Sequence, residues 1–229
     1  MKSRVGAIIV AAGRGQRMGG IDKIFANLGG QPLLARVVDV FQACSLVDQI
    51  VIVLSQRNLE LGQRLAEEHA WSKVVEVCQG GARRQDSVQE GLKRLEGCDW
   101  VVIHDGARPL LKAGLIERGL LEARDSGAAI AAVPVKDTIK FVEAGNLVQG
   151  TLERQSLWAV QTPQVFRYNI ISEAYRQIKS EVPDDAAAVE KLGHKVKVYM
   201  GSYENIKVTT KEDLALAQLI LRNREQEKG

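Results

Sequence analysis

The sequence Val-Gly-Ala-Ile-Ile-Val-Ala-Ala, residues 5–12, is a short apolar run that leads directly into Gly-Arg-Gly-Gln-Arg-Met, residues 13–18. Such a continuous apolar run is typical of a strand that is covered on both faces of a parallel sheet. The glycines of the turn let the backbone approach a ligand closely, and Arg14, Arg17 and the nearby Lys23 add positive charge. The turn therefore favours a ligand that carries phosphates, such as a nucleoside triphosphate.

Two common phosphate-binding motifs do not match this turn. A dinucleotide-binding G-x-G-x-x-G motif needs a third glycine at the position of Met18. A P-loop needs Lys and then Ser or Thr after its second glycine, whereas Ile21 and Asp22 follow Gly20. The turn alone also leaves open a plain loop whose arginines are solvated.

Composition narrows the class of protein. The chain has 229 residues, with 45% hydrophobic and 26% charged residues and a net charge of +3, which is typical of a soluble globular protein without a nucleic-acid surface. No apolar run approaches the ~18 residues of a membrane span. Cys44, Cys78 and Cys98 are too widely spaced for a zinc or disulfide framework. We expect a cytoplasmic protein with reduced thiols, no membrane or nucleic-acid partner, and one domain over residues 1–229.

Apolar runs alternate with helical periods along the chain. Strands are expected at residues 5–12, 49–54, 73–78, 100–104, 128–135 and 195–200. Helices are expected at residues 32–43, 59–70, 86–95, 112–126, 167–179, 185–192 and 210–224. This alternation predicts an α/β fold with a mostly parallel sheet, which binds ligands at the carboxyl ends of its strands.

One region interrupts that alternation. Residues 138–142 and 147–152 are short β-like runs around a turn near Gly145 and Asn146, which predicts a hairpin. Because an isolated hairpin is marginally stable in water, this one must pack against something. A second subunit and an antiparallel edge of the same sheet both remain open.

A second glycine-rich segment, residues 80–88, follows the third expected strand and reads Gly-Gly-Ala-Arg-Arg-Gln-Asp-Ser-Val. Its glycine pair permits close approach to a base or ribose, and the Ser87 hydroxyl could help to read a base. Asp86 and Ser87 could equally serve only to cap the helix that follows.

The fourth expected strand ends in Ile-His-Asp-Gly-Ala-Arg-Pro, residues 103–109. An aspartate at the tip of a parallel strand, here Asp105, is well placed to hold a divalent metal or substrate hydroxyls. Arg108 suits a phosphate, and the alternative is an Asp105–Arg108 pair that only closes the loop.

Three other features are less specific. The lone Lys207 is of a kind that is usually solvated. Asp184 and Asp185 are adjacent and predict the N-terminus of a helix, where they complement its dipole. The three histidines lack metal-ligand spacing.

Six sequence blocks, taken together and in order, resemble one family. They are residues 11–18 with Lys23, 80–88, 104–109, 134–138, 161–164 and 205–209. The first resembles the signature of the sugar-phosphate nucleotidyltransferases. The others are similar to the 2-C-methyl-D-erythritol 4-phosphate cytidylyltransferases, and the match spans nearly the whole chain.

The resemblance implies a Rossmann-like three-layer α/β sandwich with a mostly parallel sheet. It also implies a protruding β-hairpin arm at residues 137–153 that joins a homodimer. The implied reaction transfers CMP from CTP to 2-C-methyl-D-erythritol 4-phosphate, a polyol phosphate of the non-mevalonate isoprenoid pathway. The products are 4-diphosphocytidyl-2-C-methyl-D-erythritol and pyrophosphate, and the implied cofactor is Mg²⁺.

The resemblance also assigns roles to residues. The catalytic positions are Arg17, Lys23, Arg154 and Lys207, and Asp105 is the position for the metal. Substrate-binding positions are Ala11, Ala12, Gly13, Gly15, Gly80, Gly81, Ser87, Asp105, Ala107, Arg108, Thr138 and Thr162, with Thr138 and Arg154 expected from the partner subunit. Two residues depart from the family pattern. Ala82 stands where the family often has Asp, a possible contact to the base or ribose, and Pro183 stands in a segment where the family often has Thr, a possible contact to the erythritol.

Three other functions are alternatives to this one. A cytidylyltransferase for another polyol phosphate, such as ribitol 5-phosphate, would share the nucleotide half of the site. A non-catalytic CTP-binding module would lack a site for the acceptor. A dehydrogenase is disfavoured because residues 55–58, which follow the second strand, contain no acidic residue.

Overall fold

A seven-stranded sheet forms the centre of the computed structural model, which describes residues 3–13, 17–18 and 21–226. In the order in which they lie across the sheet, the strands are β13 (Lys197–Met200), β9 (Ala128–Pro134), β12 (Trp158–Arg167), β8 (Trp100–Asp105), β1 (Val5–Ala11), β6 (Gln49–Leu54) and β7 (Val74–Gln79). Strand β12 runs antiparallel to both of its neighbours, and every other pairing is parallel. The prediction of a mostly parallel α/β sheet is confirmed.

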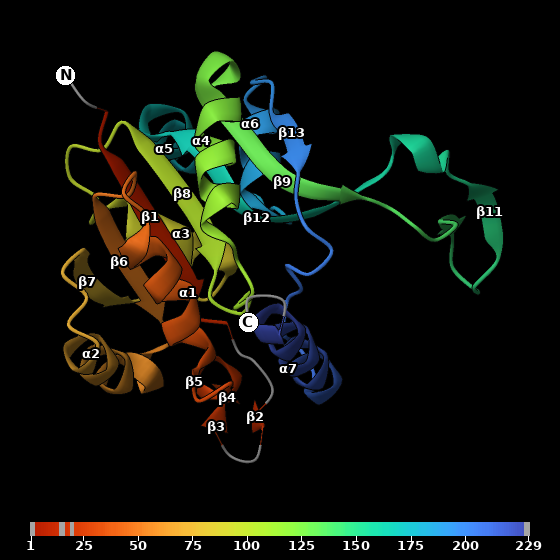
Figure 1. Cartoon of the computed structure of the whole chain (residues 1–229). Helices are drawn as coiled ribbons and strands as arrows, with labels where there is room; N and C mark the ends of the chain where they lie inside the picture. The colour runs from red at the N-terminus through yellow and green to blue at the C-terminus, as the bar shows by residue number, and fades with distance from the viewer. Residues whose placement is uncertain (1–2, 14–16, 19–20, 227–229) are drawn as a thin grey trace.

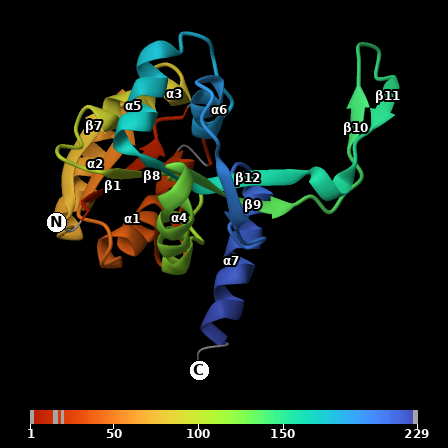
Figure 2. The same cartoon turned by 90° about the horizontal axis from the view of Figure 1, so that it is seen from above.

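Helices cover both faces of the sheet (Figures 1 and 2). One face packs against α1 (Leu33–Ala43), α2 (Leu59–Glu68) and α4 (Ala113–Ser126), and the other against α3 (Arg84–Leu92), α5 (Tyr168–Gln177) and α6 (Asp185–Lys191). Alternate residues of β1 show why its sequence is apolar throughout, because Ala7 and Ile9 lie in one core while Ile8 lies in the other. Because the sheet is buried on both faces, the fold has three layers, with the sheet between two layers of helices.

The predicted hairpin forms a separate two-stranded sheet of β10 (Lys140–Val142) and β11 (Val148–Thr151). It projects from the main body at the ends of β9 and β12, on the right of Figure 1. Gly145 and Asn146 have φ values of 87° and 60°, the left-handed conformation that a tight turn requires. The alternative of an edge strand in the main sheet is wrong, because neither strand pairs with that sheet.

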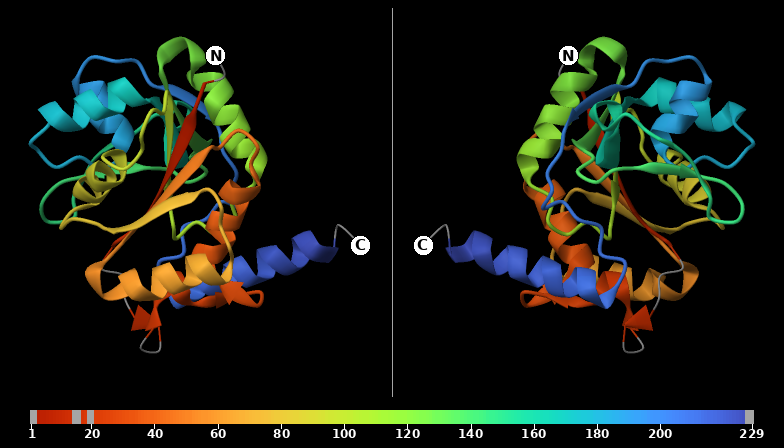
Figure 3. Two further views of the ribbon diagram at one scale, coloured as in Figure 1. Left: turned by 90° about the vertical axis from the view of Figure 1, so that its left-hand side faces the viewer. Right: turned by 90° about the vertical axis from the view of Figure 1, so that its right-hand side faces the viewer.

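Several short elements near the N-terminus lie at the bottom of Figure 1. They are the paired strands β2 (Arg17–Met18) and β3 (Ile21–Asp22), the 3₁₀ turn η1 (Lys23–Phe25), and the paired strands β4 (Asn27–Leu28) and β5 (Gln31–Pro32). Helix α7 (Lys211–Gln226) runs beside them (Figure 3) and packs Ala217 into a small core with Leu28 and Leu33. Two further 3₁₀ turns are η2 (Gln56–Asn58) and η3 (Arg154–Ser156).

The expected strands and helices are all present, with ends displaced by a few residues. Strand β12 was missed, because it contains Pro163 and several polar side chains where a buried strand normally has apolar ones. Helix α3 begins at Arg84, ahead of the predicted start at residue 86. No helix in the described part of the chain is both long and apolar enough to cross a membrane.

Candidate functional site

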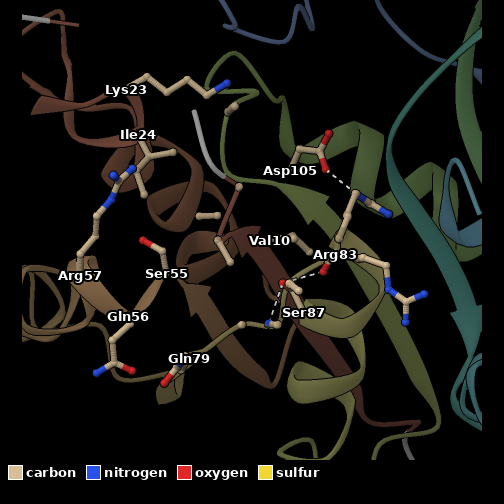
Figure 4. A pocket seen from close by; sticks show the side chains of 18 of the residues that line it. Val10, Lys23, Ile24, Ser55, Gln56, Arg57, Gln79, Arg83, Ser87 and Asp105 are labelled. Carbon is tan, nitrogen blue, oxygen red and sulfur yellow. Dashed lines mark hydrogen bonds and ion pairs between the residues drawn. The ribbon is translucent and has the colours of Figure 1, made fainter. Parts of the chain in front are cut away.

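A cavity of about 990 Å³ opens at the carboxyl ends of β1, β6, β7 and β8 (Figure 4). This is the edge of the sheet at which the sequence places its glycine-rich turns and Asp105. The described residues that line the cavity are Val10, Ala11, Ala12, Gly13, Lys23, Ile24, Ser55, Gln56, Arg57, Gln79, Gly80, Gly81, Ala82, Arg83, Arg84, Ser87, Asp105, Ala107 and Lys207.

Small residues form one wall of this cavity. An added Cβ at Gly80 would lie 2.5 Å from both the Cβ of Ala12 and the Oγ of Ser87, so this position is restricted to glycine. The Ser87 hydroxyl accepts a hydrogen bond from the Gly81 amide at 3.2 Å and donates one to the Arg83 carbonyl at 3.2 Å (Figure 4). Ser87 therefore holds the shape of the glycine turn instead of capping the helix.

The cap of helix α3 comes from Asp86. Its carboxylate accepts a hydrogen bond from the Arg83 backbone amide at 3.1 Å and pairs with the Arg83 guanidinium at 2.6 Å. The predicted capping role is confirmed for Asp86 and is wrong for Ser87, because the helix starts earlier than predicted.

Asp105 lies at the tip of β8 and is the centre of a cluster of charges. Its Oδ2 is 2.7 Å from the Lys207 ammonium, and its Oδ1 is 3.2 Å from the Arg84 Nε. Burial alone would raise the pKa of Asp105, but the positive charges of Arg84 and Lys207 hold that pKa well below its usual range. Asp105 is therefore ionised at neutral pH and joins two cations drawn from distant parts of the chain.

Arg84 is held from behind by a second, fully buried carboxylate. The Nη2 of Arg84 lies 2.7 Å from the Oδ2 of Asp185, and Tyr175 donates its hydroxyl to the Oδ1 of Asp185. The sequence predicts that Asp185 complements the dipole of helix α6, and it predicts no role for Arg84. Asp184 is the N-cap of that helix, as predicted, whereas Asp185 points into the core.

Thr162 and His104 fix the backbone at Asp105. The Thr162 hydroxyl accepts a hydrogen bond from the Asp105 amide at 3.0 Å and lies 3.0 Å from His104 Nδ1. His104 Nε2 lies 3.2 Å from the Arg108 carbonyl, so this nitrogen carries the proton and Nδ1 accepts from the hydroxyl. Burial lowers the pKa of His104 to about 4, which keeps the ring neutral.

Lys23 lies on the opposite side of the cavity from the glycine wall, at the start of η1 (Figure 4). Burial lowers its pKa, and the positive charge of Lys207 lowers it further. Arg17 lies in β2, immediately before this segment, and its side chain is outside the described part of the structure. Gly15 also lies outside the described residues.

Four predicted site residues, Arg108, Thr138, Thr162 and Arg154, are not among the described residues that line the cavity. Arg108 is largely buried and donates from Nη1 to the Asn205 carbonyl at 2.7 Å, with its Nε 3.9 Å from Asp105. Thr138 is exposed in the loop before β10, and Arg154 donates from Nη1 to the Lys136 carbonyl at 2.9 Å. Thr138 and Arg154 therefore lie at the base of the arm, away from their own chain's cavity.

The carboxylates at the cavity decide whether the predicted magnesium ion could be held there. The described residues contain no group of three or more His, Cys, Asp or Glu that could hold a metal ion. Asp105 is the only carboxylate among the described cavity-lining residues. In nucleotide sites Mg²⁺ is usually held by one or two carboxylates with substrate phosphates and water, so Asp105 fits a metal that arrives with its nucleotide. Lys207 would then have to move away from Oδ2.

Comparisons with known proteins agree with this geometry. Residues 5–223 match the model of the IspD family, 2-C-methyl-D-erythritol 4-phosphate cytidylyltransferase. A relative of that name from Dehalococcoides mccartyi is 51% identical over 222 residues, which cover 97% of this chain and 98% of the relative. Another from Alkaliphilus oremlandii is 44% identical, with 98% of each chain covered.

Solved structures show the same fold. A 4-diphosphocytidyl-2C-methyl-D-erythritol synthase from Anaerococcus prevotii superposes with a TM-score of 0.86 at 30% identity, over 96% of this chain and 97% of that one. A 2-C-methyl-D-erythritol 4-phosphate cytidylyltransferase from Thermus thermophilus gives a TM-score of 0.78 at 32% identity, over 97% and 100% of the two chains. The chain described here belongs to the 2-C-methyl-D-erythritol 4-phosphate cytidylyltransferase family.

Proposed function

We propose that this protein transfers CMP from CTP to 2-C-methyl-D-erythritol 4-phosphate and releases pyrophosphate, a step in the formation of isoprenoid precursors. One observation carries the proposal. A single cavity at the carboxyl ends of parallel strands brings Lys23, Lys207 and Asp105 together against a wall of small residues, in a chain of this family. The wall suits a nucleotide, and the cations suit its phosphates.

The reaction joins two anions. A phosphate oxygen of the acceptor attacks the α-phosphorus of CTP, a new P–O bond forms there, and the bond to the β-phosphate breaks to release pyrophosphate. The attacking oxygen is already anionic, so the step needs no strong general base, and the buried, neutral His104 is consistent with that. Catalysis then depends on positioning and on stabilising charge.

The positive side chains reduce the repulsion between the two substrates. Lys23 and Lys207 line the cavity in the structure, and the family resemblance assigns Arg17 to the same task. We assign the nucleotide contacts to Ala11, Ala12, Gly13, Gly80, Gly81, Ser87 and Ala107, all of which line the cavity. A preorganised donor to developing charge is worth about 10²–10³ in rate, so each cation is expected to matter.

Asp105 is the residue that would hold Mg²⁺ when CTP brings it. Held there, the metal would supply positive charge that offsets part of the negative charge of the phosphates. Arg84 contacts the other oxygen of Asp105 and keeps that carboxylate in place when Lys207 moves to the phosphates.

The arm completes the acceptor half of the site in a homodimer. Phe141, Leu147 and Val148 of the arm are 55%, 66% and 58% exposed, which is unusual for large apolar side chains on a projecting hairpin. A second subunit would cover them. It would also bring its own Thr138 and Arg154 to this chain's acceptor site, as the family resemblance implies.

A cytoplasmic location remains part of the proposal, supported by the free, buried state of Cys44, Cys78 and Cys98. The names of the relatives favour methylerythritol phosphate over ribitol 5-phosphate as acceptor. A binding module without activity is disfavoured because the family model and the relatives carry the names of cytidylyltransferases.

Pyrophosphate release tests the proposal. Purified protein with CTP, Mg²⁺ and 2-C-methyl-D-erythritol 4-phosphate should release pyrophosphate, and ribitol 5-phosphate or UTP in place of one substrate should give much slower release. CTP binding without pyrophosphate release with either acceptor would support the binding module instead. Faster release with ribitol 5-phosphate would move the assignment to that acceptor.

A further inference from the structure

Asp22 is a buried carboxylate that the reaction itself does not use. Its side chain is 5% exposed. Its Oδ2 accepts hydrogen bonds from the Nη2 of Arg57 at 2.8 Å and from the Nδ2 of Asn58 at 2.9 Å, and its Oδ1 accepts a longer one from the Ile24 amide at 3.4 Å. A buried carboxylate with this set of donors is held in one orientation.

The partners of Asp22 belong to a rigid part of the fold. Arg57 and Asn58 lie in η2, which follows strand β6 after one residue. Strand β6 is buried between β1 and β7, with Ile50 and Ile52 fully buried, and Asn58 is itself only 7% exposed. The contact therefore joins the segment that contains Asp22 to the carboxyl end of a central strand.

The segment that Asp22 anchors contains both N-terminal cationic positions. Asp22 is the direct partner of Arg17 in the β2–β3 pair, so the backbone at Arg17 is fixed by the backbone at Asp22. Lys23 is the next residue, begins η1 and lines the cavity on the same side as Arg57 (Figure 4). One buried side chain thus sets the position of two residues that are distant from the rest of the site in sequence.

Asp22 also contributes to the charge around Lys23. Among the described residues, the charged groups that act on Lys23 are Asp22 beside it, Asp105 of β8, Lys207, and Asp213 of α7. Burial and Lys207 lower the pKa of Lys23, and the three carboxylates oppose that effect, with Asp22 the largest of them. The carboxylate therefore helps to keep the Lys23 ammonium protonated.

We propose that Asp22 is a positioning residue for the transfer reaction, which fixes Lys23 at the cavity and the backbone of Arg17 by anchoring their segment to Arg57 and Asn58. The inference rests on the proposed function for the roles of Arg17 and Lys23. It assigns to Asp22 no contact with either substrate.

An exchange of partners tests the anchor. Asp22→Asn should lower kcat/KM for CTP by about 10- to 100-fold, the scale expected when a catalytic group is misplaced by a fraction of an ångström to an ångström. Asn58→Asp places a second carboxylate against Asp22 and should lower kcat/KM for CTP by a similar factor. The double variant Asp22→Asn, Asn58→Asp restores one carboxylate and one amide at this contact and should recover most of the lost activity.

Glu60→Gln is the matched control. Glu60 is a nearby carboxylate in the first turn of α2, is 83% exposed and pairs with Arg64 at 3.7 Å. Its loss should leave kcat/KM unchanged. Circular dichroism and thermal unfolding identify any variant that fails to fold. A folded double variant no more active than the single variants, or a folded Asp22→Asn with wild-type kcat/KM, would overturn the inference.

The pKa of Lys23 gives a second readout that needs no turnover. Trace acylation of the amine across a pH series, followed by peptide mass spectrometry, should show a lower pKa for Lys23 in Asp22→Asn than in the wild type or in Glu60→Gln. An unchanged pKa of Lys23 would contradict the claim that the Asp22 carboxylate helps to keep the Lys23 ammonium protonated. If the wild type releases no pyrophosphate at all, the proposed function fails, whereas the Lys23 titration still reports on the anchor.

Discussion

The ammonium of Lys207 lies 2.7 Å from Oδ2 of Asp105, in an ion pair that joins the segment before α7 to the tip of β8. The pair holds a cation at the cavity. Because the same ammonium is proposed to contact phosphate, binding of CTP should exchange one anionic partner for another. Arg84 keeps its contact with the other oxygen of Asp105 throughout that exchange.

Replacement of Lys207 tests the first consequence. Lys207→Ala should lower kcat by about 10²–10³, because a preorganised donor to the transition state is lost. Steady-state kinetics with both substrates at saturation gives the value. Lys211→Ala, at an exposed position at the start of α7, removes a neighbouring charge and should leave kcat unchanged. A folded Lys207→Ala protein with near-normal kcat would exclude Lys207 from the reaction.

Ser87 is expected to act through the glycine turn. Ser87→Ala removes the acceptor for the Gly81 amide and the donor to the Arg83 carbonyl, and hydrogen bonds of this kind contribute about 1 kcal/mol each. We expect KM for CTP to rise about tenfold with a smaller change in kcat. Ser172→Ala provides the comparison, because the buried Ser172 hydroxyl has no hydrogen-bond partner among the described residues. Equal KM values in the two variants would argue against a role in holding the nucleotide.

His104 should make stability depend on pH. Burial lowers the pKa of His104 from 6.5 to about 4, so between these values the unfolded chain binds a proton that the folded chain does not. The free energy of unfolding should therefore rise as pH increases through this window, by about 3 kcal/mol at most from this group. Urea denaturation gives the free energy of unfolding at pH 5 and at pH 7. The difference between these two values should be smaller for His104→Gln than for the wild type. An equal difference would mean that another group titrates.

The arm should control assembly. Leu147→Asp places a charge on an arm residue that is 66% exposed in the single chain and that a second subunit is proposed to cover. Sedimentation velocity should show a dimer for the wild type and a monomer for this variant, with loss of activity because Arg154 and Thr138 of the partner are removed. Leu121→Asp, on the exposed face of α4, should remain dimeric. A monomeric wild-type protein with full activity would contradict the role of the arm.

The central sheet could be predicted from sequence because its strands are buried on both faces. Strand β1 places Ile8 in one core and Ile9 in the other, so both positions must be apolar and the run is continuous. Strand β12 lacks this pattern. Its Gln164 is buried, yet it donates to Asp184 Oδ2 at 2.8 Å and accepts from the Ala186 amide at 3.1 Å. Those partners are the N-cap and the first turn of α6, and the local sequence of β12 does not reveal them.

Local sequence likewise predicts some of the site residues and not the others, because the missed residues depend on partners from distant segments. The residues of the glycine turns and Asp105 were found because they follow strands, and the strand ends of a parallel sheet meet at one edge. The supporting pairs of Arg84 with Asp185 and of Asp22 with Arg57 join residues far apart in sequence. Nothing in either local segment distinguishes a buried ion pair from a solvated charge. Arg57 lines the cavity, yet the only sequence signal of its segment is the lack of an acidic residue.

A crystal structure of the dimer with a non-hydrolysable CTP analogue and Mg²⁺ tests the central claim most directly. The account predicts the cytidine against the wall formed by Ala11, Ala12 and Gly80, with the ammonium groups of Lys23 and Lys207 within hydrogen-bond distance of phosphate oxygens. A nucleotide bound elsewhere, or one whose phosphates point away from both lysines, would contradict it.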